Sequence, residues 1–472
     1  MTLVAGVDSS TQSCKVVIRN LESGAVIRQG SAKHPEGTEV EPRHWWTALN
    51  AAFAAAGGLD DVDAISIGGQ QHGMVVLDEH GHVIRPALLW NDTRSAAAAE
   101  EITAHFGAEQ IARMTGSVPV ASFTSTKLRW LRGAEPENAQ RVAAVALPHD
   151  WLTWRLAGFG PVGESELGPD LSTLATDRSD ASGTGYFNPT TNEYLPQVLE
   201  FALGHVPVVP RIVMPGETAF TTASGMRIAC GAGDNAAAAL GVGATRGDVV
   251  VSLGTSGTVF AVSASQTSDA TGIIAGFASA SGDALPLVCT LNAARVLDSM
   301  SALFDVSHDE LGEMALSAPP AAEGVVLVPY FEGERTPNLP NETAHLSGLT
   351  LANNTRVNVA RAAIEGMLCG LNAGLDALRE AGVVCERIFL VGGAARNPAV
   401  QVIAGEVFGV PVVVPAPGEY VANGAAAQAA EVLAGLRPDW PLEIIITVDA
   451  ERQPQISRQY DDAAKRILTS AR

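Results

Sequence analysis

Short apolar runs alternate with helical patterns along most of the chain. The first run, Leu3–Val7, is followed by a polar turn and by a second β-rich run, Lys15–Arg19. Runs of this length, bounded by turn-forming residues, predict β-strands. Strand patterns also cover Ala64–Gly68 and Met74–Leu77, and Ala96–Phe106 has a helical pattern. This alternation predicts an α/β protein.

A second block of the same kind begins near Gly241. Asp248–Leu253 and Thr258–Ser263 are strand patterns, and Gly254–Gly257 forms the turn between them. The first block contains a similar unit, a strand, a turn that begins at Asp8 and a second strand. One such hairpin in each half predicts two related α/β domains that face each other across a cleft.

The clearest helix pattern starts near Thr355 and ends at Gly382, a residue suited to a helix C-terminus. Its apolar positions are spaced by three or four residues and predict one buried face; they are Val357, Ala360, Ile364, Met367, Leu371, Leu375 and Leu378. A strand at Arg387–Val391 follows, and then a helix that opens at Pro398, where proline fits the first turn.

Two segments of the first block have less regular patterns. Val142–Leu147 is an apolar run that fits a buried strand or the end of a helix. Gly158–Asn188 is polar and rich in glycine, which predicts loops that carry function and not core.

Composition excludes several classes of protein. The chain has 472 residues, of which 47% are hydrophobic and 17% charged, so it is long enough for two or three globular domains. The 30 basic and 51 acidic residues give a net charge of −21. This charge repels nucleic-acid backbones and anionic membrane surfaces, so we expect no partner of either kind.

Cysteine usage and hydropathy bear on the compartment. The five cysteines are scattered and form no C-x-x-C pair, which argues against a zinc ribbon and a disulfide framework. The N-terminus has no basic leader, and no apolar run of about 18 residues is free of charge and breaks. We therefore expect a cytoplasmic protein.

The first hairpin turn combines a carboxylate with several hydroxyl groups. Asp8 stands beside Ser9, Ser10 and Thr11, and Lys15 follows. Phosphoryl transfer requires donors for the phosphate oxygens and a carboxylate that holds Mg²⁺ through water. An ordinary β-hairpin turn has the same composition and is the alternative interpretation.

Gly254–Gly257 has the same ambiguity, because its two glycines permit close approach of a ligand and its two hydroxyls can donate. Neither turn fits the G-x-x-x-x-G-K-[ST] loop, and no G-x-G-x-x-G stands between a strand and a helix. The sequence therefore supports neither a Walker-type site nor a dinucleotide site.

Asp234 lies among small residues at the expected start of a helix. It could cap that helix, act as a general base toward a substrate hydroxyl, or do both. Gln71 and His72, flanked by glycines, follow a strand, and Trp90 to Arg94 follow another. Amide and imidazole groups at strand ends suit sugar hydroxyls. The histidines and cysteines show no zinc-ligand spacing.

In order, these segments resemble the FGGY family of carbohydrate kinases from Val4 to about Ala430. Gly6–Lys15 and Val251–Gly257 are similar to its two phosphate motifs, Leu390–Asn397 to its adenosine motif and Gly233–Ala237 to the segment with its catalytic aspartate. Four further stretches resemble the members that act on D-xylulose: Gly69–Gly73, Leu89–Arg94, Ser179–Thr184 and Gly333–Pro337. Ser9, Ser10 and Gln71 depart from the residues common in relatives.

The resemblance implies two actin-like, ribonuclease-H-type domains around a central cleft. Residues 1–243 would form the N-terminal domain with the sugar side and first phosphate motif, residues 244–434 the ATP-binding domain, and residues 435–472 a strand and helix packed on the body. It implies Mg-ATP-dependent phosphorylation of D-xylulose to D-xylulose 5-phosphate, with sugar and ATP as partners and a possible homodimer.

The resemblance also assigns residue roles. Asp234 would be the catalytic base, and Asp8 would be catalytic through the metal ion. An aspartate near its reference pKa of about 3.9 is ionised at pH 7, and we expect this of Asp234. The sugar contacts would be Gln71, His72, Trp90, Asp234 and Asn235, and the ATP contacts Thr11, Gln12, Lys15, Gly254, Thr255, Ser256, Gly393, Ala394 and Asn397.

Three alternatives compete with this interpretation. A kinase of the same family could act on another ketose or polyol, such as ribulose, gluconate or glycerol. An actin-like chaperone or filament protein would need a further domain, and the 42 residues from Glu431 to Arg472 are too few for one. A non-catalytic sugar sensor would not need both Asp8 and Asp234.

Overall fold

The computed structural model describes residues 1–470 and divides into two compact units. Unit 1 comprises Met1–Gly243, Ala264–Leu285 and Gly418–Pro441. Unit 2 comprises Ala244–Ser263, Pro286–Pro417 and the described chain from Leu442 onward. Each unit therefore contains segments that lie far apart in the sequence.

Unit 1 is built on a mixed sheet. Its hairpin strands β1 (Leu3–Ser9) and β2 (Ser13–Asn20) are antiparallel, and β2 pairs antiparallel with β3 (Val26–Lys33). On its other side β1 pairs parallel with β5 (Ala64–Gly69). The strand order is β13-β14-β5-β1-β2-β3, with β15 also paired to β5. These further strands are β13 (Thr218–Thr221), β14 (Arg227–Ala229) and β15 (Ala232–Gly233).

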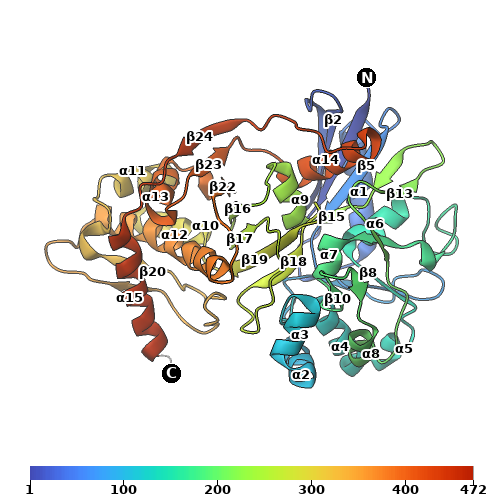
Figure 1. Ribbon diagram of the computed structural model, residues 1–472, viewed down its shortest axis with the longest axis horizontal. Coiled ribbons are helices and arrows are strands. Elements are labelled where there is room, and N and C mark those ends of the chain that lie inside the picture. Colours follow the sequence, from blue (N-terminus) through green and yellow to red (C-terminus); the bar gives the residue numbers. More distant parts are fainter. Residues whose placement is uncertain (471–472) are drawn as a thin grey trace. The chain divides into compact units, whose positions relative to one another are not determined.

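Helices cover the sheet of unit 1. Helix α1 (Pro42–Ala55) packs on β2 and β3, whereas α14 (Tyr420–Ala434) packs on β1 and β5. Figure 1 shows α14, in red, beside the blue strands from the opposite end of the chain. Helix α9 (Asp234–Gly241) packs closely on α14, because both are rich in alanine and glycine. A Cβ atom at Gly424 would lie 1.9 Å from the Ala237 carbonyl oxygen.

The remaining elements of unit 1 are short. They are β4 (Glu39–Val40), β6 (Val75–Leu77), β7 (Ala87–Leu88), α2 (Ala96–Phe106), α3 (Ala108–Thr115), α4 (Thr124–Ala134), α5 (Pro136–Gln140), β8 (Ala144–Ala146), α6 (Pro148–Leu156), η1 (Leu171–Thr173), β9 (Ala175–Asp177), α7 (Arg178–Ser182), β10 (Phe187–Asn188), β11 (Glu193–Tyr194), α8 (Pro196–Leu203), β12 (Arg211–Val213) and β18 (Ala275–Ala278).

Unit 2 repeats the strand pattern of unit 1. Strands β16 (Asp248–Leu253) and β17 (Gly257–Ala261) form an antiparallel hairpin, and β17 pairs antiparallel with β19 (Ala284–Thr290). On its other side β16 pairs parallel with β22 (Arg387–Val391), which pairs parallel with β23 (Val412–Pro415). In both units a meander of antiparallel strands continues into parallel neighbours, which confirms the predicted α/β fold of two related, actin-like domains.

The other elements of unit 2 surround this sheet. They are α10 (Ala294–Phe304), α11 (His308–Leu316), η2 (Ala322–Gly324), β20 (Val326–Val328), β21 (His345–Ser347), α12 (Arg356–Glu380), η3 (Ala394–Arg396), α13 (Pro398–Phe408), β24 (Ile444–Val448) and α15 (Pro454–Ser470). Strand β24 pairs antiparallel with the edge strand β23.

The long predicted helix is α12, with Thr355 as its N-cap and Gly382, at φ +84°, just beyond its end. Six of the seven predicted apolar positions are buried, and burial also extends beyond that face to most of the circumference of α12. Arg361 and Glu365, on its expected polar side, are buried too and form an ion pair of 2.6 Å. Polar groups inside unit 2 thus neutralise one another.

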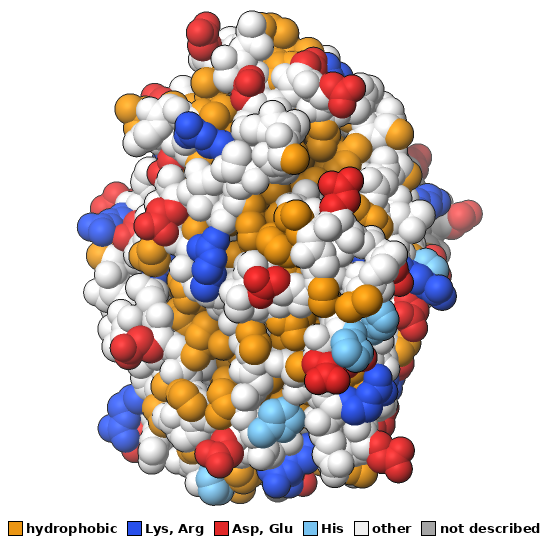
Figure 2. Space-filling model, turned by 90° about the vertical axis from the view of Figure 1, so that its right-hand side faces the viewer, with side chains coloured by type: hydrophobic (Ala, Val, Ile, Leu, Met, Phe, Trp, Pro, Cys, Tyr) orange, Lys and Arg blue, Asp and Glu red, His pale blue; other side chains and the backbone are white. Residues whose placement is uncertain are grey.

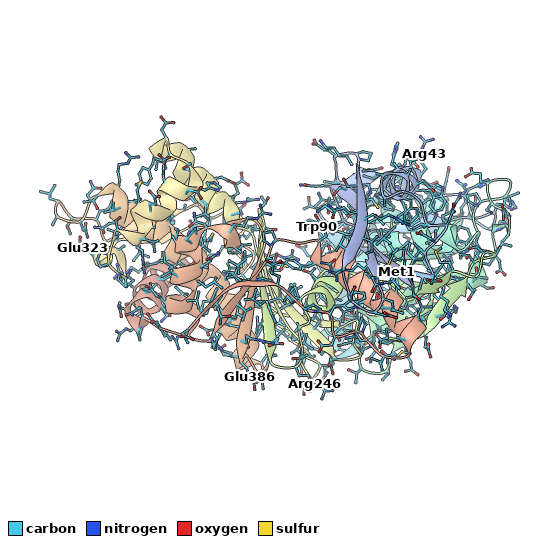
Figure 3. The ribbon with its side chains drawn as sticks, turned by 90° about the horizontal axis from the view of Figure 1, so that it is seen from above. Met1, Arg43, Trp90, Arg246, Glu323 and Glu386 are labelled. Atoms are coloured by element: carbon cyan, nitrogen blue, oxygen red, sulfur yellow. The ribbon has the colours of Figure 1, made fainter. Side chains whose placement is uncertain are left out.

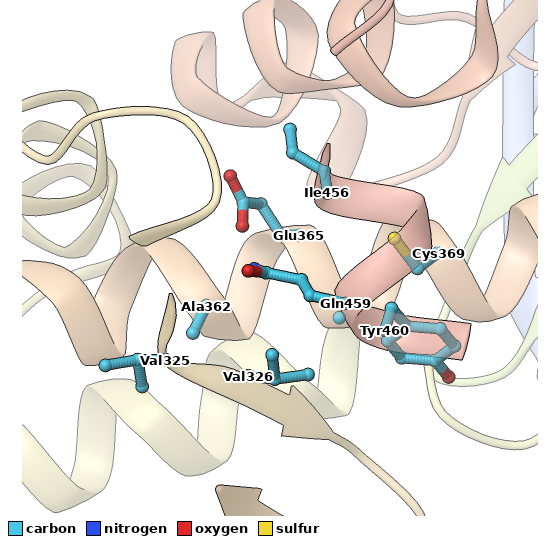
Figure 4. A pocket seen from close by; sticks show the side chains of 9 residues that line it. Val325, Val326, Ala362, Glu365, Cys369, Ile456, Gln459 and Tyr460 are labelled. Atoms are coloured by element: carbon cyan, nitrogen blue, oxygen red, sulfur yellow. The ribbon is translucent and has the colours of Figure 1, made fainter. Parts of the chain in front are cut away.

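Helix α15 packs on α12 and β20. Figure 4 shows the small pocket between these elements, lined by Glu365 and Cys369 from α12 and by Gln459 and Tyr460 from α15. Gln459 donates to the Ala321 carbonyl oxygen, and Ala321 N donates to Glu365. The C-terminal helix is therefore fixed by polar as well as apolar contacts.

Two sequence-based predictions in unit 1 need correction. The segment predicted as functional loops, 158–188, contains β9 and α7, and residues 174–187 are buried throughout. Its polar residues bond to one another, as shown below, so polarity did not mean exposure. The ladder of the first hairpin continues to the pair Ser9↔Cys14, so Asp8 lies in a strand and not in the turn. The apolar run 142–147 contains a strand, β8.

On the face in Figure 2, acidic and basic side chains are scattered among apolar ones and do not gather in one charged field. Across the described chain, none of the helices combines the length and the apolar character that crossing a bilayer requires.

Candidate active site

Three strand ends bring the first group of predicted residues together in unit 1. Strands β1 and β15 both pair parallel with β5, through Ser9↔Gly69 and Gly233↔Gly69. Asp8 therefore lies one residue before the end of β1, and Asp234 follows β15 directly. Gln71 comes soon after the end of β5. Carboxyl ends of neighbouring parallel strands are the usual ligand site of such sheets.

The two carboxylates at this sheet edge interact. Burial raises the pKa of Asp8 to about 6, although hydrogen bonding from Ser10 and the positive charge of Lys15 oppose the rise. Burial, together with the negative charge of Asp8, raises the pKa of Asp234 to about 7. The expectation of an ordinary pKa for Asp234 is therefore wrong, because the sequence shows neither the burial nor the second carboxylate.

Asp234 is the first residue of α9, and its Oδ1 accepts hydrogen bonds from Asn235 N at 2.8 Å and Asn235 Nδ2 at 3.0 Å. The N-cap position belongs to Gly233, so the interpretation of Asp234 as an N-cap residue is off by one position. The side chain of Asn235, predicted as a sugar contact, thus helps to orient the carboxylate of Asp234.

Gln71 and His72 are held by the segment around α7. Gln71 Nε2 donates to the Ser179 carbonyl oxygen at 3.1 Å, and His72 Nδ1 contacts the Gly183 carbonyl oxygen at 2.5 Å. Because a carbonyl oxygen only accepts, Nδ1 carries the proton in that contact. A Cβ at Gly233 would lie 2.7 Å from Gln71 Nε2, so only glycine leaves room for this amide.

The backbone of His72 is strained, with φ at 69°. This left-handed conformation is uncommon for residues other than glycine and costs about 1–3 kcal/mol. Two donors hold the His72 carbonyl oxygen in place, Thr124 Oγ1 at 3.1 Å and Lys127 Nζ at 3.3 Å. The ring lies 4.8 Å from the ring of Phe123, centroid to centroid.

The remaining predicted residues of unit 1 surround the first hairpin. Trp90, labelled in Figure 3 and 38% exposed, donates from Nε1 to Thr11 Oγ1 at 2.8 Å. Gln12 is exposed at the tip of the hairpin. Lys15 pairs with Glu419 at 2.6 Å. The hairpin therefore joins a predicted sugar residue, Trp90, to a predicted phosphate residue, Thr11.

The second group of predicted residues lies in unit 2. Strands β16 and β22 are parallel neighbours, paired through Ser252↔Val391, so the turns that follow them are adjacent. The first turn contains Gly254, Thr255 and Ser256, and the second contains Gly393 and Ala394. These turns occupy the place in unit 2 that the Asp8 and Gln71 segments occupy in unit 1.

The residues of these turns differ in their exposure to solvent. Thr255 and Gly393 are exposed, whereas Ala394 is buried. Asn397 is also buried: its Oδ1 accepts from Ala399 N at 2.9 Å, and its Nδ2 donates to the His308 carbonyl oxygen at 2.7 Å. Asn397 thus caps α13 and joins it to α11. These two bonds are structural and do not support its predicted contact with the nucleotide.

Sequence reasoning missed two kinds of residue. Glu419 follows Lys15 by 404 residues, a separation at which no pattern could connect them. Ser10 donates to Asp8 from two positions away, and the hydroxyl-rich turn could have suggested this bond. Ser179 and Gly183 lie in a stretch that the resemblance had named, but the hydrogen bonds that their carbonyl oxygens accept from Gln71 and His72 could not be predicted from it.

Comparison with known proteins identifies the family. Residues 3–241 match the N-terminal domain, and residues 249–432 the C-terminal domain, of the FGGY family of carbohydrate kinases. The chain belongs to this family. The match covers both hairpins, the segment of Asp234 and the turn of Gly393, and the protein is therefore a carbohydrate kinase.

Individual relatives cover nearly the whole kinase. Xylulose kinase from Streptomyces rubiginosus is 44% identical over 455 residues, covering 92% of this chain and 89% of the relative. Xylulose kinase from Streptomyces coelicolor is 43% identical over 448 residues, covering 92% and 88%. The crystal structure of xylulose kinase from Bifidobacterium adolescentis has a TM-score of 0.92 and 46% identity, covering 98% of this chain and 99% of that one.

Proposed function

We propose that this kinase transfers the γ-phosphoryl group of ATP to the terminal hydroxyl of D-xylulose, forming D-xylulose 5-phosphate and ADP. The relatives above, which are named xylulose kinases and match almost end to end, support this substrate. The observation that carries the chemistry is the pair of carboxylates, Asp8 and Asp234, at one edge of the sheet of unit 1.

Asp234 serves as the general base in this proposal. A base acts best when its pKa lies near the working pH, and the pKa of Asp234 is raised to about 7. Its carboxylate therefore takes up the proton of the sugar hydroxyl more readily than a solvated aspartate would. Gln71 and His72, fixed by bonds to the α7 segment, orient the other hydroxyls of the sugar.

The residues at this edge suit a magnesium ion. Mg²⁺ prefers oxygen ligands and keeps several waters, and Asp8 offers a buried carboxylate whose ladder neighbour Lys15 pairs with Glu419. The raised pKa of Asp8 shows that its negative charge is poorly compensated within the protein. Asp8 would hold the ion, and bound Mg²⁺ supplies charge neutralisation for the phosphate oxygens.

The turns of unit 2 bind the nucleotide in this proposal. The exposed backbone at Gly393 leaves room for the nucleotide, and the hydroxyl and N–H groups of Gly254 to Ser256 donate to phosphate oxygens. Ala394 and Asn397 contribute by fixing the turn and not by direct contact. ATP, Mg²⁺ and the homodimer remain predictions.

The experiment is ADP release from Mg-ATP with D-xylulose, L-xylulose, D-ribulose, L-ribulose, D-gluconate and glycerol, and with no sugar. We expect the highest kcat/KM with D-xylulose. A clear preference for another compound would overturn the substrate but leave the carbohydrate kinase. If the protein hydrolysed ATP without sugar as fast as it releases ADP with sugar, the proposed sugar-binding roles of Gln71 and His72 would be overturned.

A further inference from the structure

A fully buried cluster of one histidine and three carboxylates lies in unit 1. His149, from α6, places Nε2 3.1 Å from Asp180 Oδ2, 3.4 Å from Asp150 Oδ1 and 3.5 Å from Asp177 Oδ1. None of these four side chains is more than 3% exposed. Burial of carboxylates without a compensating positive charge is very costly. Burial raises the pKa of Asp180 well above its ordinary value, and Nε2 lies where a positive imidazole would offset the charge of these carboxylates.

The imidazole of His149 can carry this positive charge. Burial by itself would lower its pKa, but the charges of Asp150, Asp180 and Asp177 outweigh that effect and raise the pKa to about 9. Burial raises the pKa of Asp150 to about 6. Tyr186, whose pKa burial raises, also faces the cluster, but it is neutral at pH 7.

The cluster is connected to the sugar side of the site through α7. Asp177 caps this helix, because its carboxylate accepts hydrogen bonds from Ser179 N at 2.7 Å and Asp180 N at 3.0 Å. Ser179 in turn accepts from two directions. Its carbonyl oxygen accepts from Gln71 Nε2, and its Oγ accepts from Gly233 N at 3.1 Å, directly before the catalytic aspartate.

The same segment also holds the predicted imidazole of the site. The carbonyl oxygen of Gly183, just after α7, binds His72 Nδ1. Segment 177–183 therefore fixes three parts of the sugar side, namely Gln71, His72 and the backbone before Asp234. A shift of this short segment would displace all three together, and all three belong to the proposed sugar side of unit 1.

We propose that His149 is a positioning residue whose imidazolium neutralises Asp177 and Asp180 and thereby holds segment 177–183 against the sugar-binding residues. This inference rests on the proposed function, because it takes Gln71 and His72 as sugar contacts and D-xylulose as the sugar. A positive charge, and not an imidazole as such, is what the site requires. Lysine should therefore replace His149, and uncharged glutamine should not.

The test compares His149→Lys and His149→Gln with the wild type and with the control His205→Gln. His205 is a partly buried histidine of unit 1 whose Nε2 bonds to the Val142 carbonyl oxygen at 2.8 Å. We expect His149→Gln to raise the KM for the sugar at least tenfold while the KM for ATP changes less than twofold. His149→Lys and the control should stay within threefold of the wild type for both.

Equal changes of both KM values in His149→Gln, or loss of sugar binding in His149→Lys as well, would overturn the proposal. Nitrogen NMR of the wild type covers the case in which His149→Gln does not fold. We expect a doubly protonated imidazole at pH 7.5, and a neutral ring would overturn the proposal. So would a stoichiometric metal ion in the purified protein, since His149, Asp150 and Asp180 are close enough to share one.

These outcomes are separable from failure of the proposed function. The sugar that the wild type prefers in the panel is the one used for the variants. If that sugar is not D-xylulose, the substrate proposal fails, but a selective rise in its KM in His149→Gln still supports the role of His149. If D-xylulose is preferred and both KM values of His149→Gln are unchanged, only the role of His149 fails.

Discussion

Replacement of Asp234 by asparagine should abolish catalysis and at the same time stabilise the protein. Asparagine keeps the oxygen that accepts from Asn235, but it removes the negative charge that the burial and the charge of Asp8 oppose. Loss of a general base lowers kcat by about 10²–10⁴. Loss of a poorly compensated charge raises the free energy of unfolding.

The size of the gain follows from the pKa of Asp234, which rises from 3.8 to about 7 on folding. Such a change corresponds to at most about 4 kcal/mol. The side chain is partly exposed, so water screens the charge, and we expect roughly 1–2 kcal/mol. For a protein of this size the midpoint of thermal unfolding should rise by about 2–6 °C at pH 8.

The stability of the wild type should fall as the pH rises. Between about pH 4 and 7 the folded wild type binds a proton at Asp234 that the unfolded chain has lost, so its stability falls as the pH rises. Asparagine does not titrate. The stability advantage of Asp234→Asn should therefore be small at pH 4, grow up to pH 7 and stay constant above it.

Thermal unfolding at pH 5, 6, 7 and 8, with EDTA and without nucleotide, measures this effect. Asp248→Asn is the matched control, because Asp248 accepts from Arg387 Nε at 2.9 Å and Nη2 at 2.8 Å, and its replacement should lower the melting temperature. A lower melting temperature of Asp234→Asn at pH 8, or sugar phosphorylation near the wild-type rate, would refute the reasoning.

The remaining predictions concern two glycines. A Cβ at Gly393 would meet no protein atom within 4 Å, so Gly393→Ala should keep the melting temperature and the KM for the sugar. It should raise the KM for ATP about tenfold, because only the nucleotide would be crowded. An unchanged KM for ATP would place the nucleotide elsewhere. Gly424→Ala should lower the melting temperature by several degrees, because its Cβ would overlap the Ala237 carbonyl oxygen, whereas Gly133→Ala, a helical site with open space around it, should leave it unchanged or slightly raised. Equal effects of the last two substitutions would contradict the close packing of α9 on α14.

Local patterns predicted the parts of the fold that local physics determines. Short apolar runs on either side of a turn gave both hairpins, β1–β2 and β16–β17. Capping residues gave the ends of α12 and the start of α13, where Asn397 accepts from Ala399 N. The sequence predicted the α/β class but not the order of the strands in each sheet. That order depends on contacts between distant segments, such as the pairing of β1 with β5.

The sequence failed where polar residues are buried. Asp177, Ser179 and Asp180 were interpreted as part of a loop region, since polar residues are usually exposed. In the structure Asp177 accepts hydrogen bonds from the α7 turn, and His149 Nε2 lies 3.1 Å from Asp180 and 3.5 Å from Asp177. A partner that lies about 30 residues away in the chain, such as His149, leaves no periodic signal that would mark these residues as buried.

The sequence predicted which residues form the candidate site but not the electrostatic interactions between them. Asp8 and Asp234 were assigned to metal and base from the family resemblance, yet their mutual repulsion depends on the parallel pairing of β1 and β15 with β5. The ion pair between Lys15 and Glu419 depends likewise on the return of the chain to unit 1. Residue roles followed from motifs, whereas pKa values required the fold.

The strained and poorly compensated groups of unit 1 gather at one sheet edge. His72 has a left-handed backbone there, held by Thr124 and by Lys127, an amine whose pKa burial lowers to about 7. Asp8 and Asp234 repel each other a short way along the same edge. A sheet selected for stability alone would replace such groups by apolar residues. Their retention at this edge, beside a His149 cluster that supports it from within, is the physical reason to look for the sugar there.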